Sequence, residues 1–87
     1  MKNVEGFLES AQKGIVTVEF RKIDTDELSI MPCTLNSEVA NTKIDIKGID
    51  PKSDHIPVWA LDKKAWRAFR VSTVERWYDA TGFGSES

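Results

Sequence analysis

Apolar and polar side chains alternate over two stretches in the first half of the chain. Within residues 15–23 and 28–35, apolar side chains recur at every second position over 16–20 and 31–35, the period of a half-buried β-strand. The polar residues 24–27 between them predict a turn, so the two stretches form a hairpin. Pro32 donates no backbone hydrogen bond, which places its strand at a sheet edge or at a bulge. The side chains expected to face the core are Val16, Val18, Phe20, Met31, Cys33 and Leu35.

The same period of two returns in the second half of the chain. Residues 42–49 alternate around Ile44 and Ile46 and predict a third strand. Residues 56–61 and 65–71 predict a second hairpin, which turns at residues 62–64. Its inward side chains are Val58, Ala60, Phe69 and Val71; its opposite face carries Trp59, Leu61, Trp66, Ala68 and Arg70.

A helical period marks both ends of the chain. After Asn3, a good N-cap, apolar side chains recur at helical spacing up to residue 13, and Gly14 is placed to end the helix. Ser72 and Glu75 have the spacing of a capping box, which predicts a second helix over residues 72–80. The apolar stripes are Val4, Phe7, Leu8 and Ala11 on the first helix and Val74, Trp77 and Tyr78 on the second.

Five short strands with a helix at each end predict a mainly-β single domain. The expected fold is a small, strongly bent barrel of the SH3 or Sm kind. An open antiparallel sheet with helices on one face is the alternative. The expected parts are an N-terminal helix (1–13), the barrel (14–71), a closing helix (72–80) and a mobile tail (81–87), with a helical turn within 36–41 and a loop at 48–54.

Composition limits the means of stabilising so short a chain. Cys33 is the single cysteine of 87 residues, so no disulfide can form within the chain. Cys33 and the single histidine, His55, lack the spacing of a zinc site, and we expect no metal or cofactor. Association with a partner subunit is the one remaining means of stabilisation, so a homo-oligomer is compatible with the sequence. No apolar run approaches the ~20 residues that span a bilayer, and no signal-peptide core is present, which predicts a cytoplasmic protein without membrane contact.

Catalytic groups are scarce in this sequence. His55 lies in a polar loop, and Cys33 is expected to face the core, where a thiol behaves as a small apolar side chain. The acidic residues 24–27 lack the ligand spacing of a calcium loop. These observations predict a protein that is not an enzyme.

Basic and aromatic residues concentrate in one segment. The chain carries a net charge of −2, yet residues 56–78 hold five basic and two acidic residues, a local charge of +3. All three tryptophans lie there among arginines, a combination suited to single-stranded nucleic acid or to a protein interface. Arg70 is the preferred charged contact because it shares a face with Trp66, whereas a local ion pair at the Asp62 turn would explain Arg67. The candidate binding residues are Arg70, Arg67, Trp66, Trp59, Lys63, Lys64, Arg76 and Trp77.

Three strings resemble a family of small phage proteins described as WYL-like, with an SH3/Sm-like barrel. They fit V-x-F-x-K at residues 18–22, M-x-x-T-L at 31–35 and V-W-x-x-x-K-x-x-W-R-x-F-R at 58–70. The resemblance implies a phage product that acts in a bacterial host cytoplasm. Onto Arg67 and Arg70 it maps the regulatory ligand-sensing or nucleic-acid-sensing role of WYL-type domains.

Two functions are consistent with these observations. The first is a regulatory module that binds nucleic acid or a nucleotide through the basic and aromatic segment. The second is an effector that docks on a host protein and modulates it. The salt dependence of binding distinguishes the two functions. Binding driven by phosphate contacts weakens steeply as the salt concentration rises, whereas binding through an aromatic protein interface does not.

Overall fold

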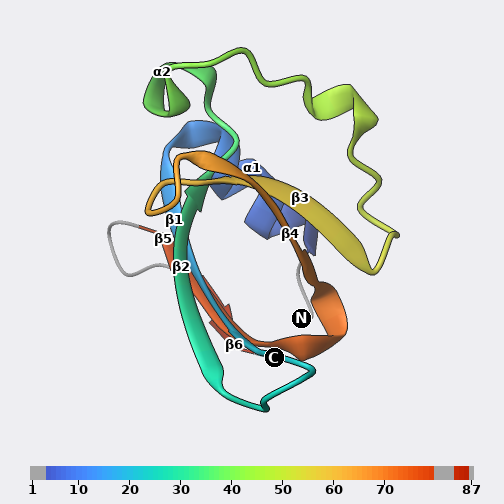
Figure 1. The fold of residues 1–87 in the computed structure, drawn as a ribbon. Helices are drawn as coiled ribbons and strands as arrows, with labels where there is room; N and C mark the ends of the chain where they lie inside the picture. The colour runs from blue at the N-terminus through green and yellow to red at the C-terminus, as the bar shows by residue number, and fades with distance from the viewer. Residues whose placement is uncertain (1–3, 80–83, 87) are drawn as a thin grey trace.

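The computed structural model describes residues 4–79 and 84–86 and places six strands in one antiparallel sheet (Figure 1). Along the sheet the strand order is β4-β3-β2-β1-β5-β6. The elements in chain order are α1 (Val4–Lys13), β1 (Ile15–Arg21), β2 (Leu28–Thr34), α2 (Ser37–Ala40), η1 (Ile46–Gly48), β3 (His55–Ala60), β4 (Ala65–Arg70), η2 (Val71–Thr73), β5 (Val74–Asp79) and β6 (Gly84–Glu86).

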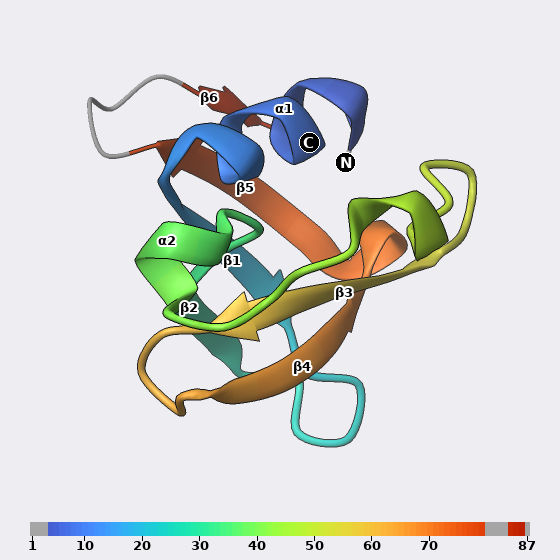
Figure 2. The ribbon, with the colours of Figure 1, turned by 90° about the horizontal axis from the view of Figure 1, so that it is seen from above.

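The sheet bends sharply between β2 and β3, whose pairing covers only Cys33 with Ala60 and Thr34 with Trp59. From this corner the β3–β4 hairpin turns across the remaining strands (Figure 2). The strands at the two ends of the sheet, β4 and β6, do not pair with each other. The mainly-β prediction is therefore confirmed, but the sheet is open and does not close into the expected barrel.

Pro32 lies at this corner, in a strand that the order places inside the sheet. Its carbonyl accepts a hydrogen bond from the Leu61 N–H at 2.9 Å, so its backbone faces β3 just before the short ladder begins. β3 ends at Ala60, so the N–H that proline lacks lies outside the β2–β3 ladder. The sequence had suggested a sheet edge or a bulge at Pro32. By strand order β2 is not an edge strand, and its pairing with β1 is not bulged, but at Pro32 it has no partner in β3, so this position is locally an edge.

The core is an aromatic cluster between α1 and the concave side of the sheet. Phe7 of α1 meets Phe69 and Trp77 edge to face, at centroid distances of 5.5 and 5.6 Å. Phe20 stacks on Phe69 at 6.2 Å. The predicted inward residues are buried or pack on this cluster: Val16, Val18, Phe20, Met31, Cys33, Leu35, Val58, Ala60, Phe69 and Val71. Edge-to-face rings add specific geometry to the burial of apolar surface.

The predicted third strand at residues 42–49 is wrong, because this segment is a loop with one turn of 3-10 helix. The Asp45 carboxylate accepts a hydrogen bond from the Lys47 N–H and starts that turn. Ile44 and Ile49 are half-buried against the core, while Ile46 is exposed. The alternation of Ile44 and Ile46 therefore has no counterpart in strand pairing, and the loop is anchored by Ile44 and Ile49 instead.

The predicted closing helix at residues 72–80 is also wrong. A 3-10 turn is followed by β5, which pairs with β1. Opposite β5, Phe20 pairs with Val74 and Glu19 pairs with Arg76, so Glu75 is an extra residue, a β-bulge. The bulge brings Val74 and Trp77, three residues apart, to the same core face, which imitates a helical stripe.

The predicted mobile tail at residues 81–87 is only partly described. Gly84–Glu86 forms β6, which pairs with β5 at Tyr78, Trp77 and Arg76. This short strand contradicts a mobile tail over those three residues. Residues 81–83 and 87 lie outside the described part of the chain.

Cys33 is fully buried, as its alternation with Met31 and Leu35 predicts. Burial, with a smaller contribution from the Asp62 carboxylate, raises the pKa of the Cys33 thiol to about 12. Because the thiolate is the nucleophile, we expect negligible labelling of the native protein by a thiol reagent at pH 8 and fast labelling in denaturant. Native-state labelling at the denatured rate would show that β2 is not packed as described.

Candidate binding surface on the β3–β4 hairpin

The outer face of the β3–β4 hairpin carries three cross-strand pairs. The register places His55 opposite Arg70, Pro57 opposite Ala68 and Trp59 opposite Trp66. Trp66 and Arg70 therefore share a face, as expected, whereas Arg67 lies opposite the buried Val58 on the other face. We use the term hairpin surface for the outer face and free edge of this hairpin: Trp59, Lys63, Lys64, Trp66, Arg67 and Arg70.

The two tryptophans of the hairpin surface differ in exposure. Trp59 is half-buried, with the buried Thr34 of β2 as its other cross-strand neighbour. Trp66 meets Trp59 edge to face at a centroid distance of 5.9 Å and keeps 44% of its surface exposed. Trp59 thus supports Trp66, and Trp66 is the ring available to a partner.

Three cations belong to the same hairpin as Trp66 and are close to it in sequence. Lys63 and Lys64 lie in the β3–β4 turn, Arg67 follows Trp66 on the edge strand, and all three are exposed. In the described part of the chain none of the three forms an ion pair. Arg67 Nη1 donates to the Trp66 carbonyl at 3.4 Å, and the local ion pair expected for Arg67 at the Asp62 turn is not found among the described residues.

Arg70 is the arginine with a local ion pair. Its Nε lies 3.9 Å from Asp54 Oδ2 and donates to His55 Nε2 at 3.3 Å. Asp54 also accepts hydrogen bonds from the backbone N–H groups of Val71 and Ser72, which fixes the loop before β3 against η2. Arg70 therefore has side-chain partners within the fold. Arg67 has no ion pair among the described residues and is the more available of the two arginines for a ligand.

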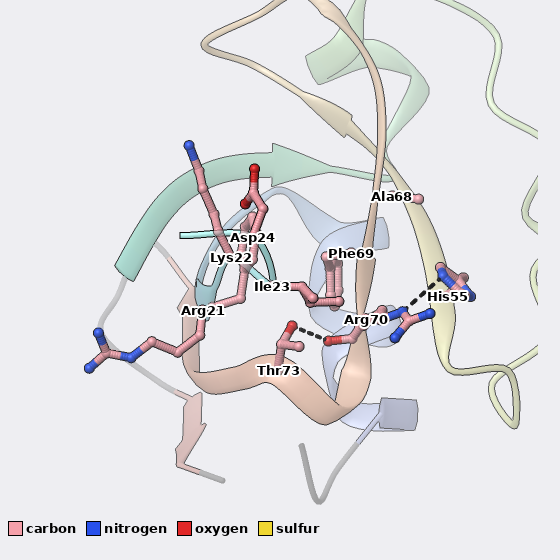
Figure 3. Close-up of a pocket in the computed structure, with 10 residues that line it drawn as sticks. Arg21, Lys22, Ile23, Asp24, His55, Ala68, Phe69, Arg70 and Thr73 are labelled. Atoms are coloured by element: carbon pink, nitrogen blue, oxygen red, sulfur yellow. Dashed lines mark hydrogen bonds between the residues drawn. The ribbon is translucent and has the colours of Figure 1, made fainter. Parts of the chain in front are cut away.

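A groove of about 410 Å³ lies beside Arg70, between the β1–β2 turn and β4 (Figure 3). Ile23 and Phe69 point toward each other across it, and Arg21 and Lys22 point away. The Thr73 hydroxyl donates to the Arg70 carbonyl at 2.7 Å and closes the end of β4. The interior of the groove is apolar, and its charges lie on the rim.

Two predicted site residues, Trp77 and Arg76, lie on β5 and outside the hairpin surface. Trp77 is buried in the core against Phe7 and is not a surface contact; no acceptor for its indole N–H is found among the described residues. Arg76 lies on β5, with Nε 3.6 Å from the largely buried Glu19 carboxylate. A hydrogen bond with the same carboxylate raises the pKa of Tyr78. The sheet order separates this cluster from the hairpin by β1 and β2.

A pocket of about 420 Å³, which sequence reasoning missed, borders the hairpin surface. It lies between α2 and the β3–β4 turn, which meet at one end of β3 (Figure 2). Its lining residues are Val39, Ala40, Asn41, Trp59, Leu61 and Lys64. Residues 39–41 are far from the tryptophans in sequence, so only the folded chain brings the two sets together.

The described residues hold no cluster of three or more histidine, cysteine, aspartate or glutamate side chains placed to bind a metal ion. Within the same residues no helix has the length and apolar character needed to cross a membrane.

Comparison of the chain with protein-family models, with curated protein sequences and with solved structures finds no match.

Proposed function

We propose that the protein is a non-enzymatic binding module that holds single-stranded nucleic acid on its hairpin surface. The observation that carries this proposal is Trp66, a half-exposed indole in contact with Trp59, on a hairpin whose turn and edge strand carry three cations without ion pairs among the described residues. An aromatic ring accepts any base by stacking, and nearby cations hold the backbone phosphates.

The distribution of charge supports the same proposal. The net charge of −2 disfavours indiscriminate binding to polyanions, because counterion release requires clustered Lys and Arg. Lys63, Lys64 and Arg67 provide such a cluster at one end of the sheet. A partner that is both anionic and aromatic would satisfy the cations and the indole together.

The resemblance to small phage proteins adds a setting to this proposal. On that basis the protein is phage-encoded, works in the cytoplasm of a bacterial host and has a regulatory role. This part depends on the three sequence strings alone and is independent of the geometry of the hairpin surface.

A protein-binding effector is the second candidate. It is favoured by apolar side chains that lie exposed outside the hairpin: Ile23 is 69% exposed and Ile30 is 58% exposed. In addition, β4 has no strand on its outer side and is open to pairing with an extended segment. A host protein bound to these surfaces would be modulated by the effector, and its binding would not depend on phosphate groups.

We expect a single-stranded oligonucleotide to bind with strong salt dependence. If Lys63, Lys64 and Arg67 each neutralise one phosphate, the logarithm of the association constant should fall with the logarithm of salt concentration with a slope of about −2. Fluorescence anisotropy of a labelled oligonucleotide at several salt concentrations measures this slope. Removing one cation by Arg67→Gln should make the slope less negative, whereas Arg76→Gln, distant on β5, should leave it unchanged. A slope near zero, or equal slopes in all three proteins, would favour the protein-binding alternative.

A further inference from the structure

We infer that the pocket between α2 and the β3–β4 turn accepts one nucleotide unit of the bound strand, with its base against Trp59 and its phosphate at Lys64. This inference rests on the proposed function and deepens it. It assigns a second subsite beside Trp66, one that encloses a base where Trp66 offers only an open platform.

The walls of the pocket suit a flat, partly apolar ligand. Val39, Ala40 and Leu61 form its apolar sides together with Trp59. Its volume of about 420 Å³ lies within the range of small-molecule sites. Because Trp59 also meets Trp66 at 5.9 Å, the pocket and the exposed indole share one aromatic wall, and neighbouring bases of one strand can occupy both.

The polar groups of the pocket are complementary to a nucleotide. The Asn41 backbone N–H closes the end of α2 by bonding to the Glu38 and Ser37 carbonyls. Its side-chain amide forms no hydrogen bond with any described residue, so its donor and acceptor are available to a base edge. The Lys64 ammonium, exposed and without an ion pair in the described structure, supplies the positive charge for a phosphate.

The backbone at Lys64 gives an independent reason to assign a role to its side chain. Lys64 has a φ of 52°, in the left-handed region that favours glycine, asparagine or aspartate. Three residues other than glycine have positive φ in the described chain, Asp26, Asn41 and Lys64, and two of them line this pocket. Lysine is the unfavourable choice at such a turn position, and left-handed residues of this kind cluster at ligand sites.

The test is a titration of the full chain with the four nucleoside 5′-monophosphates, the corresponding nucleosides and inorganic phosphate, followed by tryptophan fluorescence. We expect at least one monophosphate to bind about tenfold or more tightly than its nucleoside or phosphate alone, because both subsites must be filled. Saturable binding by phosphate alone with equal affinity would indicate a simple anion site and overturn the inference. The absence of any response to the monophosphates at millimolar concentration would overturn it as well.

Matched glycine variants identify the residues responsible. Lys64→Gly should raise the melting temperature by a few degrees, since it relieves the left-handed lysine, and should weaken monophosphate binding about tenfold or more. Lys63→Gly removes the same charge from the same turn but lies outside the pocket, and should weaken binding less than threefold without raising the melting temperature. Asn41→Gly keeps the left-handed turn and should reduce the difference in affinity among the four bases. Equal losses in the two lysine variants would assign the effect to general surface charge and not to the pocket.

Oligonucleotide binding separates this inference from the proposed function. If Asn41→Gly binds an oligonucleotide as the parent does, Lys64→Gly weakens it no more than Lys63→Gly does, and monophosphates do not bind, the pocket assignment is wrong and the hairpin surface stands. If monophosphates bind as described but no single strand binds, the pocket is a free-nucleotide site and the proposed function is wrong.

Discussion

Replacing Phe69 with alanine should lower the free energy of unfolding by about 3–5 kcal/mol, a large part of the stability of a domain this small. Phe69 is 3% exposed and lies between Phe7 of α1 and Phe20 of β1. The β3–β4 hairpin pairs with β2 over only two residues, so this ring is a main link between the hairpin and the core. Chemical denaturation followed by circular dichroism measures the change.

Two other substitutions on the same strand serve as controls for Phe69→Ala. Phe69→Leu keeps most of the buried apolar surface and should cost clearly less than the alanine variant. Trp66→Ala removes a larger ring from the exposed face and should cost only about 0.5–1.5 kcal/mol, the scale of one aromatic pair. If Phe69→Ala melts within a degree or two of the parent, the register of β4 against β3 is incorrect.

The sequence could predict those elements whose pattern has a single structural cause. The strands β1 and β3 follow an alternation that burial alone explains, and the inward residues predicted for β1 to β4 pack in the core. The helical stripe at Val74 and Trp77 has two possible causes, because a bulge at Glu75 produces the same spacing within a strand. Only the pairing of β5 with β1, a contact between distant parts of the chain, decides between them.

The candidate site was predictable in part for the same reason. Local sequence brings Trp59, Trp66 and the turn lysines together, since they belong to one hairpin. The burial of Trp77 depends on β5 packing against α1, and the ion pair of Arg70 depends on where the loop before β3 places Asp54. Asn41 reaches the pocket through α2, whose sequence carries no aromatic or basic pattern.

Replacing Trp66 with alanine should weaken the binding of a single-stranded oligonucleotide by about 1–3 kcal/mol, roughly 5- to 150-fold, the contribution of one base stacked on an aromatic side chain. The loss should be similar at low and high salt, because stacking involves no counterion release, and this behaviour separates it from the loss caused by Arg67→Gln. Trp66→Phe should restore part of the affinity, since a smaller ring still offers a stacking face. Ile30→Ala, which removes an exposed apolar side chain from β2, should leave affinity unchanged.

The Trp66→Ala variant also decides between the two candidate functions, provided that its folding is verified by its melting curve. The Trp66 ring contacts the Trp59 ring, so a small loss of stability is expected from its removal. Trp66 is not part of the hydrophobic core. If the folded variant binds oligonucleotide as tightly as the parent, the indole is not a stacking platform. The exposed isoleucines and the free edge of β4 would then be the surface to test against protein partners. If instead affinity falls and the salt slope persists, the indole and the cations act as separate parts of one nucleic-acid site.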